Sequence, residues 1–162
     1  MKIKLISALL CLTFIFSLCS CNDGGAYKND VTSKDISDAI VEAINAPQGF
    51  TAPDSDFIEF NMEGATDLCE DYAIMISSMN VNYNEFGIMR AKNEDDAKKL
   101  AEICQSYIDI KKEGTNPHYL PQEYPKIQNA KVKVYGCYVV YTILSDADAK
   151  TVESVINSKI AK

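Results

Sequence analysis

The residues with the most specific chemistry in this chain are six cysteines and a single histidine, His118. A thiol beside an imidazole can act as a nucleophile with its base, and three or four such side chains at short spacing can hold zinc. His118 lies in a Pro-rich stretch, "GTNPHYLPQEYPK", and no cysteine stands close to it in sequence. We therefore expect a surface histidine in a loop, with neither a Cys–His pair nor a zinc site.

Three cysteines, Cys69, Cys104 and Cys137, lie in the part of the chain expected to fold, and an odd number cannot all pair. Cys104 falls on the apolar face of a predicted helix and Cys137 on a predicted strand, so we expect buried free thiols, with one disulfide as the alternative. The stretch "PDSDFIE" lacks the central Gly and the final Glu of a calcium loop, and no phosphate-binding Gly-rich loop occurs. The sequence predicts no metal and no cofactor.

The first twenty residues form a second chemically distinct region. Lys2 and Lys4 precede an uncharged, mostly apolar run over residues 5–19. That run is about fifteen residues long, whereas a helix needs roughly twenty to cross the hydrocarbon of a bilayer. Because no basic cluster follows, the pattern predicts a secretory signal peptide over residues 1–20, with an uncleaved anchor helix as the alternative.

The end of this segment, "LCSC", resembles the lipobox of bacterial lipoproteins. In that pattern an aliphatic residue stands three positions before the modified cysteine, and a small residue stands directly before it. Leu18 and Ser20 meet both requirements for Cys21, whereas Cys19 would follow the bulky Leu18. The resemblance implies that Cys21 becomes the mature N-terminus and carries a diacylglyceryl group, whose two chains suffice for stable anchoring.

Charge limits the partners of the mature chain. Removal of residues 1–20 would leave 142 residues, which suits one domain. Without Lys2 and Lys4, 14 basic side chains stand against 23 acidic ones, a net charge of −9. Phosphate groups repel such a domain, so we expect no nucleic-acid partner. Anionic headgroups repel it as well, so the lipid on Cys21 would be what holds the protein at the outer, extracytoplasmic face of the cell membrane.

Hydrophobic periodicity and turn residues predict the elements of the domain. Residues 21–32 are polar and contain glycine, which indicates a flexible tether ahead of a single domain over residues 33–162. Residues 47–71 fit a short helix pair or an irregular segment equally well. We expect helices over residues 33–46, 93–113 and 145–162, strands over 72–79 and 85–92, a loop over 114–126, and a hairpin over 130–144 that turns at Tyr135-Gly136.

An internal repeat supports this organisation. "NEDDAKKL" (93–100) and "SDADAKTV" (145–152) share three identical positions at an offset of 52, and each opens a helix after a β run. Duplication and a shared helix-capping chemistry explain the match equally well. We predict an α+β fold with an N-terminal helix and two ββα units, which form a four-stranded antiparallel sheet with helices on one face.

A family resemblance is carried by three stretches: "NEFGIMRAKNEDDAKKL", "YLPQEYPKIQNA" and "GCYVVYTILSDADA". Through them the chain, from about Ala73 to Ile160, resembles a family of uncharacterised lipoproteins from Gram-positive, clostridial-type bacteria, which share domain of unknown function number 4358. The resemblance implies the extracytoplasmic location and the fold class given above. It brings no catalytic residues.

Tyrosines mark the best candidate surface for a partner. The Pro-rich loop holds Tyr119, Leu120 and Tyr124, and the second face of the predicted hairpin carries Tyr138. Exposed tyrosines offer a large contact area at low entropic cost, so these four residues are our candidate partner-binding residues. The alternative is that the loop and the N-terminal segment bury that face. We expect a non-enzymatic binding or interaction module for an envelope protein; the alternative is a small cell-envelope enzyme or a small-ligand binder.

Overall fold

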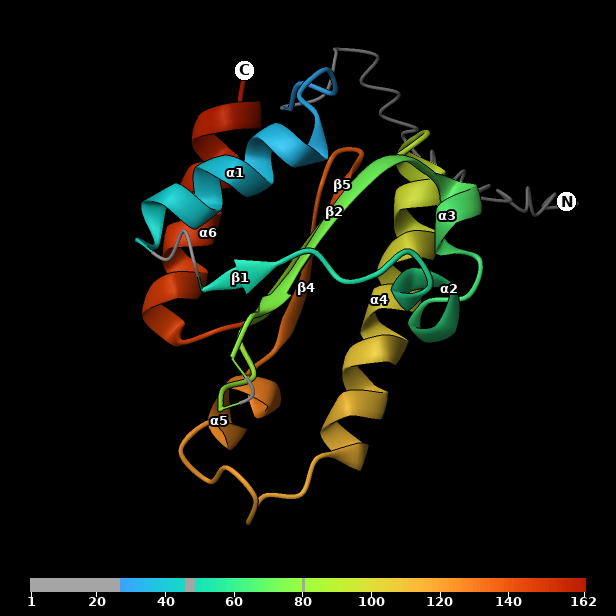
Figure 1. The fold of residues 1–162 in the computed structure, drawn as a ribbon. Coiled ribbons are helices and arrows are strands. Elements are labelled where there is room, and N and C mark those ends of the chain that lie inside the picture. Colours follow the sequence, from blue (N-terminus) through green and yellow to red (C-terminus); the bar gives the residue numbers. More distant parts are fainter. Residues whose placement is uncertain (1–26, 46–48, 80) are drawn as a thin grey trace, which may run out of the picture.

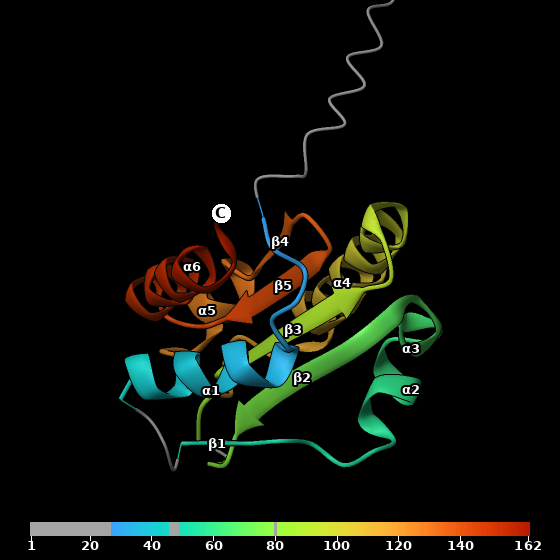
Figure 2. The ribbon, with the colours of Figure 1, turned by 90° about the horizontal axis from the view of Figure 1, so that it is seen from above.

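The computed structural model describes residues 27–45, 49–79 and 81–162. They form an α+β fold in which an antiparallel sheet lies between two layers of helices (Figure 1, Figure 2). The signal peptide and Cys21 lie outside the described residues. The elements are α1 (Ser33–Ala43), β1 (Phe50–Thr51), α2 (Phe57–Asn61), α3 (Ala65–Leu68), β2 (Cys69–Ser77), β3 (Glu85–Ala91), α4 (Glu94–Gly114), α5 (Tyr124–Gln128), β4 (Lys131–Tyr135), β5 (Tyr138–Ile143) and α6 (Asp146–Ile160).

The sheet has five strands in the order β1-β2-β3-β5-β4, and each neighbouring pair is antiparallel. The prediction of four strands was therefore one short. The fifth strand, β1, lies within the segment 47–71 that the sequence left open, together with α2 and α3. A two-residue strand shows no period-2 pattern, so periodicity cannot reveal it.

Helices cover both faces of the sheet, which corrects the prediction that they lie on one (Figure 2). α1 and α6 pack on the face that carries Phe86 and Ile88. α4, with α2 and α3, packs on the face that carries Met89 and Tyr141. The cause lies in the central strands, "EFGIMRA" and "YVVYTI", which direct apolar side chains to both faces and are buried at nearly every position.

The two ββα units follow each other in sequence but do not pack alike, since α4 and α6 lie on opposite faces. The repeat at offset 52 coincides with two equivalent helix starts. The Asn93 side chain accepts a hydrogen bond from Asp96 N–H, and the Ser145 hydroxyl accepts one from Asp148 N–H. Capping therefore accounts for the match of Asp96 with Asp148 but not for the other two identical pairs, and the two helices share no tertiary arrangement.

The β4–β5 hairpin turns at Gly136-Cys137 rather than at the predicted Tyr135-Gly136. Tyr135 pairs with Tyr138, and Gly136 takes a φ of +60°, which a primed two-residue turn requires. The register therefore differs from the predicted one by two residues. Such a shift keeps every side chain on its face, which is why the predicted face assignments of the strands survive. Cys137 itself lies half-buried in the turn, not in the core.

Residues 27–32, here termed the N-terminal strap, are bound to the domain. Tyr27 forms a β-bridge with Ala161. The Tyr138 hydroxyl donates a hydrogen bond to Val31 C=O at 2.7 Å and accepts one from Val31 N–H at 3.1 Å. The second half of the predicted tether is therefore docked on the folded domain.

Candidate functional site

One edge of the sheet is only partly covered. β1 pairs with β2 at Ser77 and Ile76 and then leaves the edge. Ser77 N–H donates to Asn84 C=O, on the β3 side of the strand. Because backbone groups alternate in direction along an antiparallel strand, the N–H and C=O groups of Tyr72 and Ile74 point away from β3, toward the uncovered edge.

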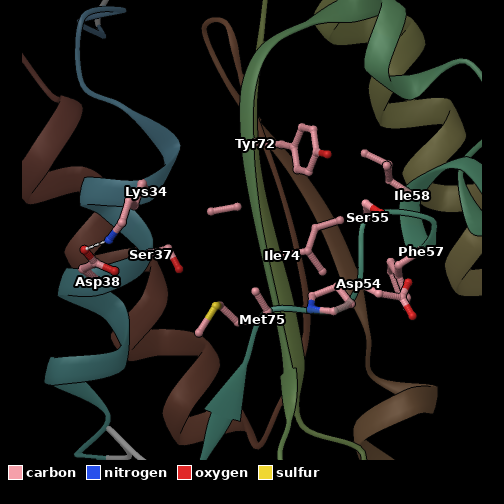
Figure 3. A pocket seen from close by; sticks show the side chains of 13 residues that line it. Lys34, Ser37, Asp38, Asp54, Ser55, Phe57, Ile58, Tyr72, Ile74 and Met75 are labelled. Atoms are coloured by element: carbon pink, nitrogen blue, oxygen red, sulfur yellow. Dashed lines mark hydrogen bonds and ion pairs between the residues drawn. The ribbon is translucent and has the colours of Figure 1, made fainter.

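A groove of about 430 Å³ follows this edge, and Figure 3 shows it from close by. We term it the β2-edge groove. Residues 72–75 of β2 form its floor. One wall is α1, which contributes Lys34, Ser37 and Asp38, and the other is the segment that leads from β1 into α2, which contributes residues 52–55 with Phe57 and Ile58.

The two walls differ in chemistry. Met75 points toward α1, where the Lys34 ammonium binds the Asp38 carboxylate at 2.5 Å (Figure 3). Tyr72 lies on the opposite side of β2, facing the wall that includes Ile58 (Figure 3). A molecule lying along the floor would therefore meet the Lys34–Asp38 pair of α1 on one side. On the other side it would meet a mixed wall, in which Phe57 and Ile58 stand with Asp54 and Ser55.

The opposite edge of the sheet is protected against pairing. Lys131 and Lys133 lie on β4, and Lys133 Nζ binds Glu153 Oε1 of α6 at 2.6 Å. Charged side chains on an edge strand disfavour the addition of a further strand. β2 has no charged residue between Tyr72 and Ser77. This difference indicates that the β2 edge is the one open to pairing.

An ion pair fixes the end of the groove next to Tyr72. Arg90 Nε and Nη2 donate to Asp71 Oδ2 at 2.9 and 2.5 Å, and Ser33 N–H donates to Asp71 Oδ1 at 2.9 Å. Partial burial acts to raise the pKa of Asp71, but the hydrogen bonds from Arg90 and Ser33 outweigh it and hold that pKa below its usual value. Arg90 Nη1 also donates to Asn29 C=O of the N-terminal strap. The strap, α1 and β2 are thus joined at one point.

The core on the α4 face holds a buried carboxylate that the sequence analysis did not single out. Glu85 is 3% exposed, and its Oε1 accepts hydrogen bonds from the hydroxyls of Tyr107 at 2.6 Å and Tyr141 at 2.9 Å. Its Oε2 binds Lys111. Burial, reinforced by the Glu85 charge, raises the pKa of both tyrosines far above the usual value. Both carboxylate oxygens are satisfied, so this cluster orders the core rather than presenting a reactive group.

Gly87 makes room for this cluster. A Cβ at Gly87 would lie 2.2 Å from Tyr141 Cε1, well inside contact distance. The missing side chain therefore lets the Tyr141 ring lie across β3, with its hydroxyl at Glu85. In the sequence, the signal for this arrangement is an acidic residue and a glycine in the strand "EFGIMRA", whose other residues are apolar except for Arg90.

The predicted partner-binding residues do not form one surface. Tyr138 is fully buried beneath the strap, so its side chain cannot contact a partner. Tyr119 is 68% exposed, whereas Leu120 and Tyr124 are half-buried in and next to the loop before α5. That loop lies at the end of the molecule far from the β4–β5 turn (Figure 1). The sheet face that was predicted to be open and to carry this surface is covered by α1 and α6.

Cys69 and Cys104 lie in the same core cluster, whereas Cys137 lies in the β4–β5 turn and His118 in the loop before α5. Cys69 and Cys104 are buried free thiols, and burial raises the pKa of each to about 12, so neither is an activated nucleophile. The prediction of a buried free thiol is thus confirmed for Cys104, whereas Cys137 is free but half-buried. His118 is exposed in its loop.

Within residues 27–45, 49–79 and 81–162, no group of three or more His, Cys, Asp or Glu side chains is placed to hold a metal ion. Among the helices of the same residues, none combines the length and the apolar character needed to cross a bilayer.

Comparison with known proteins gives one match. Neither the curated proteins nor the solved structures that were searched include a match to this chain. A protein-family model matches residues 59–144, which is just over half of the 162 residues and includes β2, the central strands and α4. The chain therefore belongs to the family described as domain of unknown function DUF4358.

Proposed function

We propose that this protein is an interaction module, lipid-anchored through Cys21 at the outer face of the cell membrane, which binds an extended segment of an envelope protein. The segment would pair with β2 in the β2-edge groove as an added strand. The observation that carries the proposal is the pair of outward-pointing residues, Tyr72 and Ile74, whose backbone groups line the floor of an open groove. The anchor is supported by Leu18 and Ser20 ahead of Cys21.

Strand addition is a recognised way to bind peptides, in which backbone bonds supply affinity and side-chain pockets supply specificity. Tyr72 and Ile74 offer about four backbone hydrogen bonds, which together contribute about 2–6 kcal/mol at roughly 0.5–1.5 kcal/mol each. A complex with a micromolar dissociation constant requires about 8 kcal/mol. The walls of the groove must therefore supply a large part of the binding free energy.

Site-specific photocrosslinking in native envelopes tests this function. A photoreactive phenylalanine analogue replaces Tyr72 on β2 or, as a matched control, Val134 on β4; their side chains are 43% and 46% exposed. We expect position 72 to crosslink to one defined segment of another envelope protein, mapped by mass spectrometry, and position 134 to give no such product. Equal crosslinking from both positions, or none from position 72, would refute the proposal.

A small-ligand binder is the second candidate, because the groove volume of about 430 Å³ falls within the range of ordinary ligand pockets. Ser37, Asp38 and Ser55 place polar groups along it. The same experiment separates the two candidates, since a small ligand would leave no crosslinked polypeptide at position 72. In that case, a ligand taken up from an envelope extract should raise the melting temperature of the purified protein.

A further inference from the structure

The α1 wall of the groove continues as a shallow acidic hollow. Asp38 and Met75 line both the groove and the hollow, which extends along α1 to Glu42 and Asn45. Asp38 and Glu42 stand one helical turn apart, and both are exposed. Lys34 pairs with Asp38, whereas the Glu42 carboxylate meets no cation among the residues that the structure describes. This wall therefore carries a surplus of negative charge.

The facing wall combines the polar Asp54 and Ser55 with apolar side chains. Phe57 and Ile58 belong to the same core cluster as Ile74, and Tyr72 adds a ring that is 43% exposed. Successive side chains of a strand point to opposite faces of the sheet. In a segment paired with Tyr72 and Ile74, one side chain would therefore meet the α1 wall, and the residues before and after it would meet the wall that holds Phe57 and Ile58.

We propose that the β2-edge groove selects extended segments in which a Lys or Arg, directed at Asp38 and Glu42, is flanked by apolar residues directed at Phe57 and Tyr72. The inference rests on the proposed function and names the class of segment that it binds. The formal charge of −7 on the whole chain adds long-range attraction for such a segment. It also disfavours a second copy of this acidic chain as the occupant.

Synthetic peptides test the selection directly. The full chain, isotope-labelled and purified in a non-ionic detergent, is titrated with the blocked peptide Ser-Val-Lys-Val-Lys-Val-Ser and with its analogue that has Glu in place of Lys. We expect the Lys peptide to bind at least about tenfold more tightly. It should also slow amide hydrogen exchange at Tyr72 and Ile74, while Ser77, whose N–H already donates to Asn84, should change little.

Matched variants identify which wall of the groove is responsible for the preference for the Lys peptide. Glu42→Lys should reduce the preference for the Lys peptide at least about threefold, because it reverses a charge on the α1 wall. Glu102→Lys reverses an equally exposed charge on α4, across the sheet, and should leave the preference unchanged. Tyr72→Pro removes an outward N–H and should weaken binding of the Lys peptide, whereas Tyr72→Val keeps that N–H and should bind more tightly than the proline variant.

The outcomes separate this inference from the proposed function. Equal affinity for both peptides, with protection of Tyr72 and Ile74, would overturn the charge selection and leave strand addition in place. Tight binding of the Lys peptide without protection of these amides would overturn strand addition itself. If position 72 crosslinks in native envelopes to a second copy of this chain, the inferred class of segment is wrong.

Discussion

Buried thiols and tyrosines should make this protein unstable in mildly alkaline solution. Burial raises the pKa of Cys69 and Cys104 from 9.0 to about 12, and it raises the pKa of Tyr107 and Tyr141 well above 10.0. The folded state therefore keeps protons that the unfolded chain gives up. The stability that these groups contribute is complete below pH 9 and declines as the pH rises above it.

The size of the effect follows from the proton linkage. At pH 10, ionisation favours the unfolded chain by roughly 1 kcal/mol at each of Cys69 and Cys104. Each tyrosine adds less than about 1 kcal/mol at this pH and more above it. The loss between pH 8 and pH 10 is thus about 3 kcal/mol, a large share of the 5–15 kcal/mol that is typical of a whole domain.

Urea unfolding followed by circular dichroism, with a reductant present, measures this loss. The wild-type midpoint should fall by about 1–3 M urea between pH 8 and pH 10, given an m-value of about 1–3 kcal/mol per molar urea. Cys104→Ala should be less stable at both pH values but lose roughly 1 kcal/mol less between them. Cys137→Ala, at the half-buried thiol in the β4–β5 turn, is the control and should keep most of the wild-type pH dependence. If the wild type and Cys104→Ala lose the same stability, the reasoning is refuted.

Three other substitutions test separate parts of the structure. Gly87→Ala should destabilise the protein by about 1–3 kcal/mol or more, because the new Cβ meets the Tyr141 ring. Gly114→Ala is the control, since a Cβ at Gly114 meets open space. Thermal melting compares the two variants. Tyr138→Phe leaves Val31 N–H and C=O without their partner, so it should lower the free energy of unfolding by about 1–3 kcal/mol and speed amide exchange at Val31. Tyr119→Phe is the control and should change neither quantity. Cys21→Ala should be released from the membrane or remain as an unmodified precursor, and intact-mass analysis of membrane-bound wild type that shows unmodified Cys21 would contradict the anchor.

The elements could be predicted where a long amphipathic pattern exists. α1, α4 and α6 each show apolar residues at helical spacing and a side-chain cap, so their starts agree with the sequence to within about one residue. The layer arrangement was mispredicted because two ββα units were assumed to place their helices alike. The apolar stripe of α1, with Ile36 and Ile40, needs a sheet face of its own, and Phe86 and Ile88 provide it. The continuous apolar run of β5 was the sequence signal that both faces are buried.

The β2-edge groove could not be predicted from the sequence, for a different reason. It exists because β1 stops pairing with β2 after two residues and because α1 lies alongside the bared edge. Both features depend on contacts between residues far apart in the sequence, and neither produces a periodic hydrophobic pattern in residues 47–71. Tyr138 shows the same limit, since its burial depends on the strap, which the composition of residues 22–32 presents as a free polar tether.

The strap also limits where the proposed partner segment can lie. Six peptide links separate Cys21 from Tyr27, so a lipid on Cys21 would hold the docked strap within about 20–22 Å of the membrane surface. The strap leads directly into α1, the charged wall of the groove, and Arg90 fixes it to Asp71 beside Tyr72. The loop that carries Tyr119 lies at the other end of the molecule, away from the end where the chain enters the fold (Figure 1). An anchored domain would therefore hold the groove nearer to the membrane than that loop, which favours a membrane-proximal segment of an envelope protein as its partner.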